Sequence, residues 1–586
     1  MRNDILDVYA GAATADLVVT NGRIVDVMRR EVRDGGVAVK SGRIVKVGDV
    51  DDLAASAAEV LDAGGRFLTP GLIESHAHSY HANLNMTEYA RICLARGTTA
   101  VAESFYGQGQ IRGKDAVRFF YDELRRTPLT VLFLVPALAY LQNLELGLPS
   151  TPGTVTADDL FEMLDWEGCR GLEEPPWIPV NERDPVMTRL IAEALRRGMV
   201  VMGHGAGLTN DEVAAYASFG ITADHECITA EEAVVRVENG IMVSFRETPI
   251  ARNQRDVQRA VTEYGCDPSL FMFSSDVPDA VSFVRVGHID EFIRIAIEGG
   301  IDPIDAVRMG TINPARYYRV DHELGSLTPG RQADILLVGD LERFSVETVI
   351  ARGEVVVELG AWKKALPQPV YPEFLRHTVK LTRALTVSDL EVRAPEGVAT
   401  ATVRVIGAES LLSDERHVEL PVVAGVVHSD PVRDVLKVAM VDRYARGSEA
   451  AVAFMQGFGL QKGAIATSYN PFFNNVMALG ASDEDMVVAA NAVAELGGGF
   501  VVALDGEVIG SLPLPLCGLL SDGLAQDAVD QLERLHELVG ELGCKIEWPF
   551  HNFAFTAVVG ELPRLKMSDR GLFDVTTREH LSTIVQ

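Results

Sequence analysis

Apolar strand-like runs alternate with amphipathic helical stretches from residue 68 to residue 319. A strand predicted at 67–75 leads to a helix at 87–97, and a strand at 98–104 leads to a helix at 113–126. Repeated βα units over about 250 residues favour an α/β fold with a (β/α)8 barrel. An open doubly wound sheet is the runner-up, but no glycine-rich phosphate loop follows a predicted strand.

The sequence on both sides of the barrel region is typical of antiparallel β structure. Residues 16–48 alternate β-prone runs with Asn21-Gly22 and Ser41-Gly42, which predict hairpin turns. β-prone runs return after residue 320. We therefore expect one small β-sandwich domain, built from residues 1–67 and 320–375, beside a barrel over 68–319.

A third domain of mixed α/β character is expected over residues 376–586, after a proline-bounded linker at 367–372. Its clearest elements are a strand predicted at 417–428, a helix at 482–497 and a hairpin at 499–514. Asp505-Gly506 is the predicted turn of that hairpin.

The charge and cysteine content narrow the functional classes. The formal net charge is −30, which disfavours nucleic acid and anionic membranes as partners. The six cysteines form no CxxC pair, as expected in a reducing compartment. The chain shows neither an N-terminal secretory signal nor a long uncharged apolar run, so a cytoplasmic location is predicted.

Metal-binding residue types follow five of the predicted barrel strands. His76 and His78 share one face of the first strand because they are two residues apart. The other strand ends carry Glu173-Glu174, His204, His225 and Asp276. Catalytic groups of a barrel gather at the carboxyl ends of its strands, so a chance origin of the whole set is disfavoured.

The donor set predicts a hydrolytic metal site. Imidazoles and carboxylates suit zinc, manganese or iron(II), and no thiolate selects a softer ion. One carboxylate can bridge two ions, which would share a hydroxide and clamp the reacting oxygen. Asp276 can also carry the proton from that water to a leaving group.

Longer motifs resemble the adenine deaminase family of the amidohydrolase superfamily. They include RGLEE at 170–174, the run 203–233, GHIDEFIRIAIEGG at 287–300, ASDEDMVVAANAVAELGGG at 481–499 and KMSDRGLFDV at 566–575. The resemblance implies a homo-oligomer with two divalent ions, Mn²⁺, Fe²⁺ or Zn²⁺. It implies one ion on His76, His78, Glu174 and Asp276, and a second on Glu174, His204 and His225. The implied catalytic residues are Asp276, Glu174 and His225.

The chain departs from the family pattern at residues 79–83, 104–107 and 471–474, and at Asp276-Val277, where the family has an aspartate pair. Aromatic or apolar residues replace several polar ones there, which indicates an altered substrate pocket. The residues expected to contact the substrate are Tyr80, His81, Glu103, Phe105 and Tyr106. An exposed loop position is the alternative for His81, and core packing is the alternative for the aromatic residues.

Three residues near the predicted ligands are expected to have roles other than metal binding. Glu226 is expected to point away from the site if its strand continues, and to cap a helix. His288 and Asp290 are expected to support the metal ligands or to begin a helix.

The leading hypothesis is a metal-dependent hydrolytic deaminase of adenine or a related amino-heterocycle, in which a metal-bound hydroxide attacks and ammonia leaves. The second hypothesis is hydrolysis of a cyclic amide, or of an amide-like C–N bond in a less polar substrate. A non-catalytic relative is the third, and it is disfavoured because all six implied ligands are present.

Overall fold

The barrel is closed by eight parallel strands in the part of the chain that the structure, a computed structural model, describes: residues 3–141, 144, 151–408, 413–447, 449–557 and 564–585. The strands are β6 (Leu72–Ala77), β7 (Thr98–Glu103), β8 (Thr130–Pro136), β9 (Cys169–Glu173), β10 (Val200–Val201), β11 (Ala223–Asp224), β12 (Met242–Phe245) and β15 (Phe271–Phe273). The predicted (β/α)8 fold is confirmed.

Two seams close the ring of strands. A parallel bridge between Met202 and Ala223 joins β10 to β11, and a bridge between Ala77 and Asp276 joins β6 to the chain after β15. At the second seam Asp276 N donates to His76 O at 3.0 Å, and His78 N donates to Asp276 O at 2.9 Å. The first and last strands therefore meet at three predicted metal ligands.

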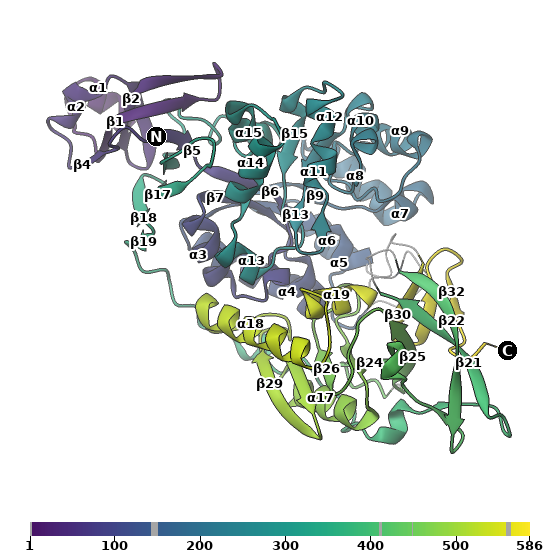
Figure 1. The fold of residues 1–586 in the computed structure, drawn as a ribbon. Helices are drawn as coiled ribbons and strands as arrows, with labels where there is room; N and C mark the ends of the chain where they lie inside the picture. The colour runs from purple at the N-terminus through teal and green to yellow at the C-terminus, as the bar shows by residue number, and fades with distance from the viewer. Residues whose placement is uncertain are drawn as a thin grey trace.

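Helices cover the outside of the barrel (Figure 1). They include α3 (Met86–Ala95), α4 (Tyr106–Arg125), α6 (Ala157–Met163), α8 (Pro185–Arg196), α9 (Asn210–Ser218), α10 (Ala230–Glu238), α13 (Ala280–Arg285), α14 (Ile289–Glu298), α15 (Pro303–Met309) and α16 (Ile312–Tyr317). α8 begins at a strong start signal, since the Asp184 side chain accepts hydrogen bonds from two amides of the first turn. Pro185 then takes the first helical position.

One predicted helix differs in its bounds. The helix expected at 113–126 starts at Tyr106, and the backbone kinks at Arg112 and Gly113. Further along, residues 302–318 form two helices, α15 and α16, and Pro314 has no N–H to bond the carbonyl one turn earlier.

The strand predicted over 67–75 is two strands in different sheets. β5 (Phe67–Pro70) pairs with β1 and β16 of the flanking sheet, whereas β6 belongs to the barrel. The break lies at Gly71, where a Cβ would lie 2.1 Å from Thr99 Oγ1. Only glycine fits this crossing.

The flanking sheet has nine strands and takes them from both ends of the barrel sequence (Figure 1). They are β1 (Leu17–Asp26), β2 (Glu31–Lys40), β3 (Arg43–Gly48), β4 (Glu59–Asp62), β5, β16 (Ile335–Val338), β17 (Val346–Ala351), β18 (Glu354–Glu358) and β19 (Ala361–Trp362). Ser41-Gly42 is a turn, as predicted. Asn21-Gly22 is not: it is a bulge inside β1, with Asn21 at φ 53°.

The C-terminal region holds a ten-stranded sheet. Its strands are β20 (Val392–Arg393), β21 (Thr400–Gly407), β22 (Asp414–Val423), β23 (Val426–Val427), β24 (Val435–Val441), β25 (Ala451–Gln456), β26 (Ala464–Thr467), β27 (Val476–Gly480), β28 (Gly499–Leu504) and β29 (Glu507–Pro513). The helix α17 (Asp483–Glu495) and the hairpin of β28 and β29 are confirmed. The strand predicted at 417–428 instead turns at Ala424-Gly425 between β22 and β23.

The C-terminal region packs directly on the barrel. Helix α18 (Ala525–Glu541) contacts α13 and α3. Helix α19 (Pro549–Ala554) reaches the loop after β6 through His551, whose Nε2 is 3.2 Å from the carbonyl of His81. Ser521 N donates to Asn83 O at 2.9 Å, which ties the segment before α18 to the loop after His78. Among the described residues, no helix is both long and apolar enough to cross a membrane.

Candidate metal centre

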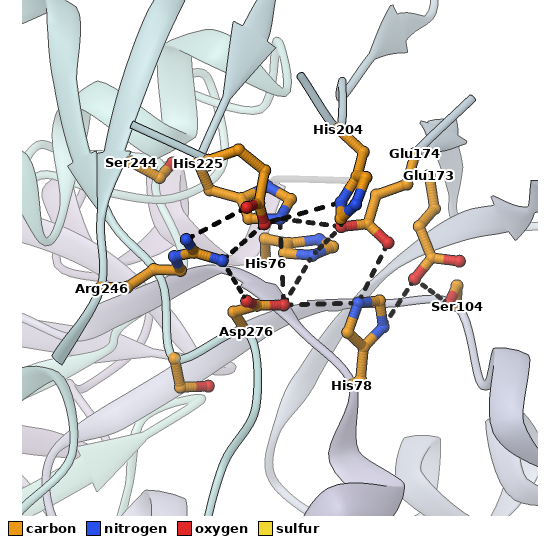
Figure 2. Close-up of polar contacts among 12 residues, drawn as sticks. His76, His78, Ser104, Glu173, Glu174, His204, His225, Ser244, Arg246 and Asp276 are labelled. Atoms are coloured by element: carbon orange, nitrogen blue, oxygen red, sulfur yellow. Dashed lines mark hydrogen bonds and ion pairs between the residues drawn. The ribbon is translucent and has the colours of Figure 1, made fainter. Parts of the chain in front are cut away.

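Glu174 lies at the centre of the predicted ligands (Figure 2). Its Oε1 is 3.1 Å from His76 Nε2 and 2.9 Å from His225 Nε2, and its Oε2 is 3.1 Å from His78 Nε2. His204 Nδ1 lies 3.4 Å from Oε1. One carboxylate thus faces four imidazoles that come from three different strand ends.

Asp276 closes the other side of the cluster. Its Oδ1 lies 3.7 Å from His76 Nε2, 3.5 Å from His78 Nε2 and 3.9 Å from His225 Nε2. The structure therefore brings all six predicted ligands together.

The two predicted carboxylate ligands have unusual backbones. Glu174 has φ 41° and Asp276 has φ 56°, in the left-handed region that residues other than glycine seldom adopt. Each lies one to three residues past the end of its strand, where the chain turns away from the sheet. Strained residues of this kind concentrate at functional sites.

The donors fit a divalent metal ion. Both ring nitrogens of His76 and of His225 are buried without a hydrogen bond of good geometry among the described residues. Groups of three or four donors converge within coordination range: His76, Glu174, His225 and Asp276; His204, His225 and Glu226; and His78, Glu173 and Glu174. Shared members make these groups overlap, and a cation would satisfy nitrogens that the protein leaves unpaired.

Electrostatics favour a cation at this place. Burial opposes ionisation of Glu174, yet the imidazoles of His78 and His76 hold its pKa well below the usual range. For His225, burial opposes protonation, but the carboxylates of Asp276 and Glu174 raise its pKa to about 9. Positive charge is thus stabilised here although the site is buried.

Arg246 was not predicted, although it occupies an equivalent position at the end of β12. Its Nη1 donates to Asp276 Oδ2 at 2.7 Å and to Glu226 Oε1 at 2.5 Å (Figure 2). Its place at the end of the seventh barrel strand could have indicated a role in the site. The prediction was based on metal-binding residue types, and arginine is not one of them.

Glu226 does not point away from the site, as the sequence analysis expected. Its Oε1 is 3.1 Å from His225 Nε2 and 3.6 Å from His204 Nδ1. β11 ends at Asp224, so the alternation of faces along a strand no longer applies two residues later.

Further side chains orient the ligands. Glu173 Oε1 is 2.9 Å from His78 Nδ1 and accepts a hydrogen bond from the Ser104 hydroxyl.

His288 Nε2 lies 2.9 Å from Glu74, whose carboxylate accepts from the amide of His76. His288 therefore supports the site through Glu74, in agreement with the expectation for it. Asp290 accepts from the amide of His288 at the start of α14, as a helix-start residue does.

Three of the five predicted substrate residues lie beside the metal ligands. The hydroxyls of Tyr80 and Tyr106 are 2.5 Å apart, and the Tyr106 ring meets the His78 ring edge to face at 4.6 Å. The His81 ring lies 5.8 Å from that of His78. His81 is buried, not exposed, and burial together with the nearby His78 holds its pKa well below the usual range.

Glu103 and Phe105 have other contacts. Both carboxylate oxygens of Glu103 accept from backbone amides, at 2.6 Å from Ser79, 2.9 Å from Ser104 and 2.7 Å from Phe105. The Phe105 ring packs on Tyr121, with centroids 6.2 Å apart. Glu103 thus holds two loops in place, and Phe105 is a core residue.

The fold and the site are those of the amidohydrolase class of metal-dependent hydrolases. The amidohydrolase family model matches residues 67–356, and the model of the adenine deaminase C-terminal domain matches residues 410–579. A solved amidohydrolase structure overlaps 58% of this chain and 99% of its own at 21% identity and a TM-score of 0.43, a likeness too weak to argue from.

Full-length relatives narrow the class. An adenine deaminase of Clostridium botulinum is 32% identical over 99% of this chain and 97% of its own length. An adenine deaminase of Ruegeria sp. is 34% identical with the same coverage, and one of Moorella thermoacetica is 33% identical over 98% and 96%. The chain therefore belongs to the adenine deaminase family.

Proposed function

We propose that this protein is a metal-dependent deaminase that hydrolyses the exocyclic amino group of adenine and releases ammonia. The proposal rests on the arrangement around Glu174. Its carboxylate faces four imidazoles, and the carboxylate of Asp276 faces the same cluster of histidines. The choice of adenine as the substrate rests on the relatives named adenine deaminase, which match nearly the whole chain.

The proposed metal assignment keeps two ions. His76, His78, Glu174 and Asp276 would hold one ion, and Glu174, His204 and His225 would hold the other. The overlapping donor groups support this arrangement. Divalent ions at such sites lower the pKa of water to about 7 and so supply a nucleophile at neutral pH.

Asp276 is proposed to move the proton. Burial opposes its ionisation, but His225, His76 and Arg246 hold its pKa well below the usual range, so Asp276 is present as the carboxylate, the form that can accept a proton. Its Oδ1 faces the histidines while Oδ2 is fixed by Arg246. Oδ1 takes the proton of the attacking water and delivers it to the amino nitrogen, which leaves as ammonia.

Glu174 and His225 complete the proposed catalytic set. His225 Nε2 lies 2.9 Å from Glu174 Oε1 and 3.9 Å from Asp276 Oδ1, so one imidazole faces both carboxylates.

Product analysis tests the function. The purified protein loaded with manganese, zinc or iron(II) is incubated with adenine, and both ammonia and the purine product are quantified. We expect ammonia in equal amount to an oxo-purine with an intact ring. A new carboxylate from a panel of cyclic amides, with no ammonia from adenine, would favour amide hydrolysis instead.

The same preparations identify the ion and count it by elemental analysis. A homo-oligomeric assembly and a cytoplasmic location stay predictions, and light scattering and cell fractionation check them.

A further inference from the structure

Side chains of the C-terminal region reach the loop that follows the metal ligands of β6. The Tyr469 hydroxyl is hydrogen bonded to His81 Nδ1, across 388 residues of sequence. The His551 ring donates from Nε2 to the carbonyl of His81 at 3.2 Å. Both contacts are buried: the first holds the His81 ring, and the second holds its backbone carbonyl.

The His81 imidazole stands at the centre of an aromatic cluster. Ring centroids lie 4.0 Å away for Tyr80, 5.5 Å for Tyr469, 5.8 Å for Phe555 and 6.5 Å for Tyr106. Tyr80 and Tyr106 come from the barrel loops, whereas the other two come from the C-terminal region. The cluster therefore exists only when the two regions are packed together.

The amide groups beside this cluster are joined in the same way. Asn474 Nδ2 donates to Gln110 Oε1 at 2.6 Å, and Gln110 lies one helical turn after Tyr106 on α4. Gln110 Nε2 and Asn474 Oδ1 are buried and have no hydrogen-bond partner among the described residues. Two departures named in the sequence analysis, at 104–107 and 471–474, thus border one polar and aromatic surface.

We propose that Tyr469 is a positioning residue that directs His81 Nε2 at a ring nitrogen of the heterocyclic substrate, so that the C-terminal region takes part in substrate selection. This proposal rests on the proposed function. Tyr469 occupies Nδ1, and among the described residues Nε2 has no hydrogen-bond partner. A planar heterocycle with nitrogen in its ring matches both the flat aromatic surroundings and the single polar atom left on His81.

Two substitutions of His81 separate contact with substrate from a purely structural role. The amide of asparagine reaches the position of Nδ1 and keeps the bond to Tyr469, but it has nothing at Nε2. The longer side chain of glutamine places its amide near Nε2. We expect H81N to lower kcat/KM for adenine about 10- to 100-fold and H81Q to lower it less, at unchanged metal content. A purely structural role predicts the opposite order.

Adenine analogues that replace one ring nitrogen by C–H locate the contact. For wild type, one of the 1-, 3- and 7-deaza analogues should bind more weakly than adenine in equilibrium binding. In H81N the ratio of dissociation constants for that analogue should fall towards one, because the nitrogen then has no partner to lose. Y469F should reduce the same ratio about threefold or more, whereas Y264F, which removes a surface hydroxyl bound to Glu231, should leave it unchanged.

Unchanged ratios in both H81N and Y469F would overturn the inference. A wild-type enzyme that releases no ammonia from adenine counts against the proposed substrate only. The H81N and H81Q comparison is then made on whichever amino-heterocycle of a purine and pyrimidine panel is deaminated, and equal losses there reject the role of His81.

Discussion

Arg246 Nη1 lies 2.7 Å from Asp276 Oδ2, while the other oxygen of the same carboxylate faces three histidines of the cluster. One oxygen of the Asp276 carboxylate thus binds the arginine, and the other faces the proposed cation site. The guanidinium is buried and also pairs with Glu226, so it neutralises charge that the barrel could not otherwise hold.

R246M should destabilise the protein by about 3–5 kcal/mol, because it leaves two buried carboxylates without their partner. The loss should shrink when a divalent ion is added, since the proposed ion site includes one of these carboxylates, Asp276. Urea unfolding with and without manganese measures this. R252M, which removes an exposed arginine 3.5 Å from Glu547, is the matched control, and equal stabilities of the two variants would contradict the prediction.

D276N should lower kcat for ammonia release about 10²- to 10⁴-fold, the usual range for loss of a positioned acid–base group. Asparagine keeps the shape but cannot accept the proton. Steady-state kinetics, with metal content measured on the same samples, checks this. D389N, at a surface carboxylate paired with Arg383, should keep full activity, and an active D276N would rule out the proposed proton transfer.

Removal of metal should abolish activity and lower the melting temperature. An ion that binds only the folded protein stabilises it by about 2.7 kcal/mol when its concentration is 100 times the dissociation constant. Chelation followed by gel filtration, thermal melting and readdition of manganese or zinc tests this. Full activity and an unchanged melt in a metal-depleted sample would be incompatible with the site.

The hydroxyls of Tyr80 and Tyr106, 2.5 Å apart, should be energetically coupled. Y80F and Y106F should each cost about 1–3 kcal/mol, because each leaves a buried hydroxyl unpaired. The double variant should cost less than the sum, since no hydroxyl is then left alone. Urea unfolding of the four proteins completes the cycle, and strict additivity would show that the pair does not interact.

Glu123 should make stability fall as pH rises. Burial raises its pKa from 4.5 to about 7, although hydrogen bonds from Thr87 and Tyr371 oppose this. Between these two values the folded state keeps a proton that the unfolded state releases, so raising the pH favours unfolding, by about 3 kcal/mol at most. Above pH 7 the effect is constant.

E123Q isolates that contribution because its amide cannot ionise. The stability of wild type minus that of E123Q should decrease between pH 5 and pH 7.5, as measured by urea unfolding at both values. E59Q, at an exposed strand position, should show no such change. A difference that is flat with pH would contradict the shifted pKa.

The sequence was informative wherever chemistry follows from position on a strand. His76, His204 and Asp276 could be predicted because parallel strands of a barrel end at the same rim. The prediction that Glu226 points away from the site was wrong because its strand had already ended. Arg246 was missed because a cation is not expected among metal ligands, although it balances their charge.

Contacts between distant regions could not be predicted. Tyr469 meets His81 only because the C-terminal sheet packs on the barrel, and no local pattern records how two regions dock. The same holds for Gly71, whose role depends on the side chain of Thr99 in the next strand.

The seam at Asp276 carries a consequence for assembly. The backbone of Asp276 joins the last strand to the first through His76 and His78, so these ligands come together only when the ring of strands is complete. A chain with an open ring would hold scattered histidines and bind metal weakly. Metal uptake therefore reports on the final step of folding, the closure of the barrel. A nascent or damaged barrel would be recognised because it binds no metal ion.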